Sequence, residues 1–347
     1  MRMWEVLMDR VKPELVELAG MFGEKLPASW KKERMARRAA ERMAGDPERL
    51  MMLINRDTMR FMRAALEANP DGFLCMDSVD PAQASEMVHH GALCAALGLV
   101  GGAQGPNGEY GLQMTEEWME LLRSGAGWQE GRARYLDSVM RCFRGIVETY
   151  GALRFEDAQA MLCRCFPKED AALLRWLTAA RPDLCRLDFL RVEDGGEPDW
   201  ISSPRLSDRF DELYAALKTR ANVPYRAFAR KQYEFAAEHE WPVYPECYRE
   251  ALDMMVRLGM EWRDAEDCLV DAIDMRQAEL DGEEDALNMI LQSHDWPSLP
   301  QVQELIELLV PLMNSVPMWL LKGNSSSEMT RVIAGQGAKI LPFPGKR

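Results

Sequence analysis

Cysteines and histidines are the residues of this chain whose chemistry and spacing could support metal binding. Cys163 and Cys165 are its closest pair of cysteines. Positions i and i+2 of a helix point to different sides, so both cannot readily hold one tetrahedral metal ion, and core packing is the better interpretation. His90 and Cys94 stand four residues apart in a predicted helix, but two further ligands are not evident. We therefore expect no metal site and no cofactor.

Acidic side chains offer acid–base and cation-binding chemistry, again without a complete pattern. His239 lies between two glutamates and His294 lies beside Asp295, yet no nucleophile is tied to either histidine. Four aspartates follow one predicted helix, namely Asp264, Asp267, Asp271 and Asp274. They lack the loop glycine and alternating oxygen ligands of a calcium loop, so a solvated face is expected. The sequence predicts a non-enzymatic protein, and a metal-dependent enzyme is the least supported alternative.

Basic side chains give the most useful signal for function. Arg34, Arg38 and Arg42 recur at every fourth position of a predicted helix, with Lys31, Lys32 and Arg37 beside them. Such a row can contact phosphates without reading bases. A second basic cluster comprises Arg205, Arg209, Lys218, Arg220, Arg226, Arg230 and Lys231. These patterns predict contact with DNA or RNA through residues 29–44 and 205–231, and an ordinary solvated surface is the alternative.

The elements that must position these residues are mainly helices. We expect a first helix over residues 4–21 and a second, capped by Ser29, over residues 30–44. Helices over residues 55–68 and 82–97 then precede two apolar segments that flank an Asn107-Gly108 turn, which is a hairpin signal. Helices followed by a small hairpin are the layout of a winged helix. The same layout recurs between residues 129 and 202, where residues 193–198 form the predicted turn.

The end of the chain predicts an acidic antiparallel helical bundle. From Pro224 onward every sizeable segment has a helical pattern. Residues 231–300 hold 18 acidic and 5 basic side chains, whereas the other residues hold 38 and 37. Cys268, Ala272 and Met275 are expected to face the core, and the four aspartates of the same helix are expected to face outward. The surface of this bundle repels polyanions, so we expect it to bind protein.

The predicted fold is therefore mainly α, with five segments. Residues 1–50 form a small basic helical module, residues 51–125 and 126–220 form one or two winged-helix-like units with short β-hairpins, residues 221–330 form the bundle, and residues 331–347 form a basic Gly/Pro tail. The N-terminus lacks an apolar signal core, and no run approaches the roughly 20 apolar residues of a membrane span. The eight cysteines include no C-x-x-C pair, which favours a reducing cytoplasm without membrane contact.

Two stretches resemble known bacterial modules. The stretch from Leu15 to Ala19 and on through Trp30-Lys31-Lys32-Glu33 resembles the SAP and Rho-terminator N-terminal type, in which basic residues open the second of two short helices. The segment from Asn314 to Met329 looks like the one before the terminal zinc motif of uncharacterised SEC-C-containing proteins. Here the tail after Gly337 holds no cysteine, so zinc binding is not carried over. The resemblance implies architecture more than activity.

Two functions follow as predictions. The first is a non-enzymatic, nucleic-acid-associated protein that contacts phosphates through its basic N-terminal module and its winged-helix-like units. The alternative is a protein-interaction adaptor, associated with the ribosome or a chaperone, that binds no nucleic acid.

Overall fold

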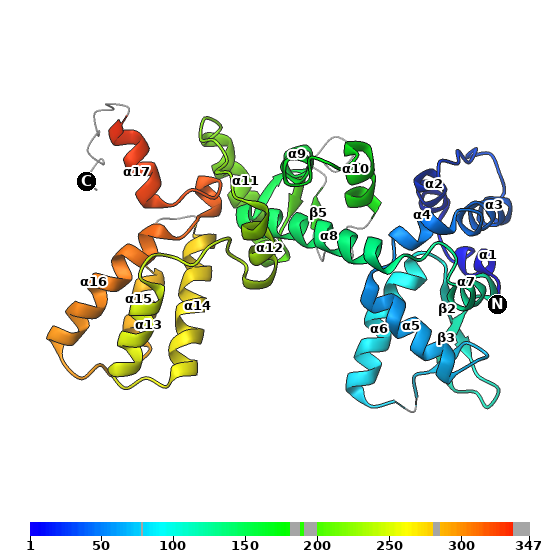
Figure 1. Ribbon diagram of the computed structural model, residues 1–347, viewed down its shortest axis with the longest axis horizontal. Coiled ribbons are helices and arrows are strands. Elements are labelled where there is room, and N and C mark those ends of the chain that lie inside the picture. Colours follow the sequence, from blue (N-terminus) through cyan, green and yellow to red (C-terminus); the bar gives the residue numbers. More distant parts are fainter. Residues whose placement is uncertain (78, 181–187, 191–199, 280–284, 336–347) are drawn as a thin grey trace. The chain divides into compact units, whose positions relative to one another are not determined.

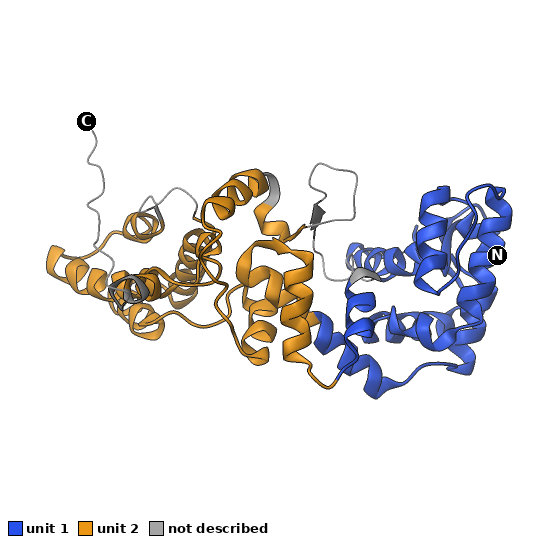
Figure 2. Cartoon of the chain, turned by 90° about the horizontal axis from the view of Figure 1, so that it is seen from above, with its two compact units in different colours: residues 1–140, 169–184 blue, residues 141–168, 185–347 orange. Residues whose placement is uncertain are grey.

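The computed structural model is mainly helical, as the sequence predicts (Figure 1). It describes residues 1–77, 79–180, 188–190, 200–279 and 285–335. The chain forms two compact units, coloured separately in Figure 2. Unit 1 comprises Met1–Met140 and Glu169–Leu184, and unit 2 comprises Arg141–Lys168 and Cys185–Arg347. Each unit is described by itself below.

Four short helices open unit 1: α1 (Met3–Leu7), α2 (Lys12–Met21), α3 (Lys32–Ala44) and α4 (Pro47–Met52). The single helix predicted over residues 4–21 is wrong, because Pro13 is tolerated only in the first turn of a helix and α2 begins anew there. The predicted cap Ser29 is also wrong, since α3 begins after Lys31 without a side-chain cap. Asp46 does cap α4, accepting a hydrogen bond from the Arg49 amide.

A helix–sheet arrangement follows, built from α5 (Arg56–Ala68), β1 (Phe73–Cys75), α6 (Pro81–Ala96), β2 (Val100–Gln104), β3 (Tyr110–Met114) and α7 (Glu116–Ser124). The three strands are antiparallel in the order β1-β3-β2, and Leu112 pairs with both Leu74 and Gly102. The predicted hairpin is present, and Gly108 supplies the positive φ of its turn. Asn55, Asp80 and Thr115 cap the three helices through their side-chain oxygens.

One hydrophobic core joins the first 122 residues of unit 1. It runs from Met3 in α1 to Leu122 in α7, and its largest fully buried side chains include Phe22, Met43 and Trp118. The core therefore includes residues from both the predicted module 1–50 and the predicted unit 51–125. The division of the chain into five segments stays a prediction.

Helix α8 (Glu130–Tyr150) contributes residues to both units. In unit 2 a second antiparallel sheet has the order β4-β6-β5, formed by β4 (Ala152–Arg154), β5 (Asp188–Leu190) and β6 (Trp200–Ser202). Along the chain, α9 (Phe155–Cys165) of unit 2 and α10 (Ala171–Ala180) of unit 1 lie between β4 and β5, and η2 (Pro204–Arg209) and α11 (Phe210–Thr219) of unit 2 follow β6. The turn predicted over residues 193–198 lies outside the described residues.

The rest of unit 2 is helical: α12 (Arg230–His239), α13 (Tyr248–Arg257), α14 (Trp262–Ala278), α15 (Asp285–Gln292), α16 (Leu299–Ser315), η3 (Trp319–Leu321) and α17 (Ser326–Gly335). Helices α13 to α16 share one core, which includes Met255, Ile273 and Leu309. The predicted inward position of Met275 is wrong, since this side chain is 42% exposed. The side chain of its neighbour Asp274 instead contacts Arg205 of η2. The tail beyond Gly335 lies outside the described residues.

Among the described helices, none is by itself both long and apolar enough to cross a membrane. Helix α16 and the segment Trp319–Thr330 pass that test only as a pair, and the pair is bent by 48°. The inner side of α16 is buried in the core of unit 2, where Leu305, Leu309 and Leu312 have no exposed surface.

Candidate interaction sites

The predicted phosphate-binding row on α3 divides into two groups. Arg37, Arg38 and Arg42 are held by other groups of unit 1. Arg37 contacts Glu33 at 3.0 Å and lies 3.6 Å from the centre of the Trp4 ring. Arg38 contacts Glu24 at 3.1 Å and Glu41 at 3.3 Å, and its hydrogen bonds to these carboxylates raise the pKa of Arg38. Arg42 donates to the Phe22 carbonyl oxygen at 2.9 Å.

Lys31, Lys32 and Arg34 form the other group, at the N-terminal end of α3. The guanidinium of Arg34 lies 3.9 Å from the centre of the Trp30 ring. No ion pair of these three cations occurs within the described part of the chain. Because exposed ion pairs contribute little free energy, all six cations could turn to phosphate, but these three would do so without breaking a contact to a carboxylate.

Most of the second predicted basic cluster is also engaged within unit 2. Arg209 pairs with Glu212, Arg226 with Glu328 and Arg230 with Glu234. Lys218 lies 4.1 Å from the centre of the Tyr214 ring, and Arg220 donates to the Ala216 carbonyl oxygen. Lys231 is exposed. Residues 205–231 thus show fewer uncommitted cations than the sequence alone suggests.

Arg205 is largely buried, with 19% of its side chain exposed. Its guanidinium contacts Glu240 and Asp274 at 3.1 Å each and donates to the Gln277 side-chain oxygen at 3.1 Å. Burial, with further repulsion from Glu240, raises the pKa of Asp274 to about 7 against the attraction of Arg205. The predicted solvated position of Asp274 is therefore wrong. This network fixes η2 against α14 and the end of α12.

Glu148 lies close to this network and is almost fully buried, at 1% exposure. It accepts a hydrogen bond from the Ser203 hydroxyl at 2.5 Å, and Arg144 approaches it at 3.6 Å. Burial raises the pKa of Glu148, while the Ser203 bond opposes that shift. Among the described residues, the contacts of the Glu148 carboxylate are Ser203 and Arg144 and include no histidine, so we interpret this buried pair as structural.

The helix–sheet arrangement of unit 1 lacks cations altogether over most of its length. Between Arg63 and Arg123 the sequence contains no Lys or Arg and nine Asp or Glu residues. Glu67, Glu86 and Glu120 are exposed there, on α5, α6 and α7. This signal is plain in the sequence, but averaging over a longer, nearly neutral front part hides it. A surface of this kind repels phosphate and attracts basic protein.

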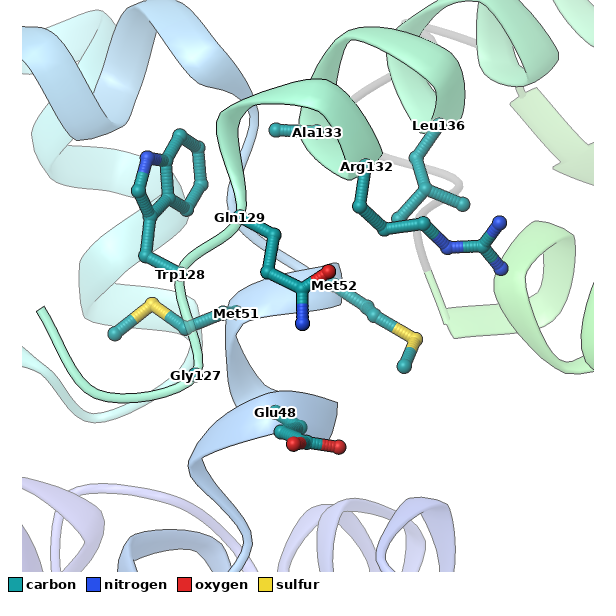
Figure 3. A pocket seen from close by; sticks show the side chains of 9 residues that line it. All are labelled: Glu48, Met51, Met52, Gly127, Trp128, Gln129, Arg132, Ala133 and Leu136. Atoms are coloured by element: carbon teal, nitrogen blue, oxygen red, sulfur yellow. The ribbon is translucent and has the colours of Figure 1, made fainter.

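A small cavity of about 140 Å³ lies in unit 1 between α4 and the start of α8 (Figure 3). Met51, Met52 and Trp128 contribute apolar walls, while Glu48 and Arg132 lie at its edges. Gly127 lets the preceding loop approach α4, since a Cβ there would lie 2.6 Å from the Pro47 backbone. The lining contains no nucleophile, and the size suits one apolar side chain of a partner.

A second cavity of about 140 Å³ is lined by residues of α2 and α6. Its floor is apolar, with Leu18, Leu53 and Leu93, and its edge carries Arg10, Glu14 and Glu17. A shallow apolar floor with a charged edge is the ordinary anatomy of a protein-binding surface.

The titratable residues weighed from the sequence do not assemble into an active site. His90 is buried, contacts the Thr58 hydroxyl at 2.9 Å, and has its pKa lowered by burial. Burial raises the pKa of the Cys94 thiol. His239 stacks on Phe235 and His294 lies against Trp296. Within the described ranges, no group of three or more His, Cys, Asp or Glu residues could hold a metal ion.

Comparisons with protein-family models, curated proteins and solved structures find no match to this chain. The resemblance to SEC-C-associated proteins and to the SAP and Rho N-terminal modules therefore stays a prediction.

Proposed function

We propose that this protein is a non-enzymatic adaptor whose partner is another protein with a basic surface. The single observation that carries the proposal is the absence of Lys and Arg between Arg63 and Arg123. Those residues form the whole first sheet and most of the helices around it.

We further propose that both three-stranded arrangements are winged-helix-like. A winged helix that binds DNA needs cations on the helix and hairpin that meet the duplex. The first of these units has no Lys or Arg on α6 or on the hairpin formed by β2 and β3.

Two further features support a protein partner. The cavities of unit 1 have apolar floors with charged edges, and each could accept an apolar side chain of a partner. The acidic helices of unit 2 add a second surface that favours a basic partner over a polyanion, because residues 231–300 carry 18 acidic and 5 basic side chains. We place the adaptor in the cytoplasm, consistent with its cysteine usage.

Affinity purification from the native host, with nuclease treatment in parallel, tests this function. The proposal expects a nuclease-resistant protein partner. A triple variant, Glu67→Lys, Glu86→Lys and Glu120→Lys, should lower its recovery roughly tenfold or more, because three attractive charges become repulsive. Glu156→Lys on α9 is the single-site control, since this exposed residue of unit 2 lies outside both acidic stretches. Partners that disappear on nuclease treatment, or recovery unchanged in the triple variant, would contradict the proposal.

The uncommitted cations of α3 favour nucleic-acid association as a second candidate function. Lys31, Lys32 and Arg34 lie together where the first turn of α3 also presents free backbone N–H groups, which bind phosphate well. Filter binding at two salt concentrations tests it. Changing these three residues to Ala should remove salt-dependent binding to DNA or RNA, whereas Arg37→Ala should retain most of it. Intact protein that shows no salt-dependent binding would eliminate this candidate.

A further inference from the structure

Strand β2 lies at one edge of the first sheet, because the strand order is β1-β3-β2 (Figure 1). Its pairing with β3 is antiparallel and continues into the turn, where the Gly105 amide donates to the Glu109 carbonyl oxygen at 2.8 Å. In an antiparallel pair, every second residue bonds to the neighbouring strand. The odd-numbered residues of β2 therefore bond to β3, whereas the N–H and C=O groups of Gly102 and Gln104 point away from it.

This edge is open to a further strand. Gly102 and Gln104 are exposed, and the described residues contain no fourth strand beside β2. Proteins often protect such an edge with Lys, Pro or a bulge, but β2 has the sequence Val-Gly-Gly-Ala-Gln and pairs without a bulge. Glycine within a strand often marks a place where another backbone approaches closely. The opposite edge is already used in part, since the Phe73 amide donates to the Asp71 carboxylate at 3.2 Å.

Tyr110 of β3 lies beside this open edge. Its side chain is 56% exposed, and a Cβ on Gly102 would lie 3.2 Å from its hydroxyl oxygen. The Tyr110 amide donates to the exposed Asp77 carboxylate at 2.7 Å, which places a negative charge nearby. An aromatic ring attracts Lys and Arg side chains, and the chain supplies neither between Arg63 and Arg123. The edge is therefore complementary to an extended segment that carries Lys or Arg.

We propose that an extended segment of a basic partner protein adds to the first sheet as a fourth strand along β2. Its backbone exchanges hydrogen bonds with Gly102 and Gln104, and one of its Lys or Arg side chains lies on the Tyr110 ring. The inference rests on the proposed function and adds where, and in which conformation, the partner binds. A polyanion cannot form this ladder. A second copy of this chain is disfavoured because two acidic surfaces would face each other.

Amide hydrogen exchange of the full-length protein with a peptide probe tests the proposal. The probe is an eight-residue peptide of alternating Lys and Thr, because β-branched residues favour an extended chain. In the saturated complex, exchange of the Gly102 and Gln104 amides should slow roughly tenfold or more. The Gly101 and Ala103 amides, already bonded to β3, should change little. A probe that does not bind, or unchanged exchange at Gly102, would overturn the proposal.

Two substitutions at Gly102 form a matched pair. Gly102→Pro removes the outward N–H without breaking a bond to β3, as an edge strand allows. It should weaken probe binding roughly tenfold, because a carbonyl oxygen of the probe then lacks its donor. Gly102→Ala keeps this N–H and meets only the hydroxyl end of Tyr110, so it should bind within about twofold of wild type. Equal binding by the two variants would overturn the proposal.

Substitutions of Tyr110 test the cation contact in the same way. Tyr110→Ala should weaken probe binding about three- to fivefold, whereas Tyr110→Phe keeps the ring and should bind like wild type. Equal binding by these two variants would contradict the placement of Lys or Arg on the ring. Since the exchange measurement uses the wild-type protein, a variant that misfolds does not decide the outcome.

The triple variant of Glu67, Glu86 and Glu120 separates this inference from the proposed function. If the triple variant lowers recovery of the native partner but Gly102→Pro changes neither that recovery nor probe binding, the partner binds elsewhere. The fourth strand is then wrong and the proposed function stands. If recovery is unchanged in the triple variant, the proposed function fails, and the two Gly102 variants still decide whether the edge accepts a basic strand.

Discussion

The guanidinium of Arg205 holds carboxylates from two parts of unit 2, Glu240 and Asp274. In the sequence Arg205 is one cation of a basic cluster, because its partners lie 35 and more residues away. Charge patterns find cations, but only the fold shows which of them are neutralised. The same holds on α3, where Arg38 meets Glu24 from the preceding loop. Basic residues were predictable here, and their availability to a ligand was not.

Removal of Arg205 should destabilise unit 2 strongly. Arg205→Met leaves Glu240 and Asp274 without their cation, at a cost of roughly 3 kcal/mol. Arg209→Met is the matched control, because the Arg209–Glu212 pair is exposed and should contribute well under about 1 kcal/mol. Urea denaturation of both variants measures the difference. Equal free energies of unfolding would show that the buried network contributes no more than a surface ion pair.

Asp274 should make the stability of unit 2 depend on pH. Its pKa in the folded protein is about 7, above the ordinary value of 3.8, so the folded state binds the proton more tightly than the unfolded state. This contribution is fully present below pH 3.8 and is lost as pH rises through 7. Acidification from about pH 8 to about pH 5 should raise the free energy of unfolding by on the order of 2 kcal/mol.

Denaturation at both pH values, with Asp274→Asn as the comparison, checks this expectation. The variant should lose most of the dependence and keep the smaller share that Glu148 contributes, since burial raises the pKa of Glu148 as well. A dependence of the same size in Asp274→Asn would exclude Asp274 as its source.

At the scale of elements, the close approach of α8 and α12 depends on Gly145. A Cβ at this position would overlap the Tyr233 carbonyl oxygen at 1.7 Å, which is backbone and cannot turn aside. Gly145→Ala should therefore destabilise unit 2 by roughly 2 kcal/mol or more. Gly131→Ala in the same helix has no atom within 4 Å and should be neutral or stabilising by up to about 1 kcal/mol. Thermal unfolding of the two variants should shift in opposite directions or by clearly different amounts.

Local signals account for the elements that the sequence predicted. The Asn107-Gly108 hairpin follows from turn chemistry, and α5 and α6 match the helices predicted over residues 55–68 and 82–97. Strand β1 was missed because its three residues, Phe73–Cys75, gain their strand conformation by pairing with β3 across the intervening helix α6. The break between α1 and α2 was missed although Pro13 signals it. Packing partners far along the chain, such as Tyr233 for Gly145, leave no local signal.

At the scale of the whole molecule, charge alternates along the chain. Two acidic stretches, residues 64–122 and 231–300, hold 27 acidic and 5 basic side chains. The remaining residues hold 29 acidic and 37 basic side chains. The formal net charge of −14 therefore describes neither part. A basic protein partner and a polyanion would be attracted to different segments, which is why the two candidate functions can be separated by substitutions in unit 1 alone.

The cation-free stretch of unit 1 also has a practical consequence for mapping any complex. Trypsin cleaves only after Lys and Arg, so it should release Ala64–Arg123 as one long peptide in every digest. Amine-reactive cross-linkers find no lysine there either. A contact on the proposed binding face would therefore escape the usual tryptic and lysine-based protocols. Glu-specific digestion, combined with carboxylate-reactive cross-linkers, should divide this face into readable peptides and place cross-links on Glu67, Glu86 or Glu120.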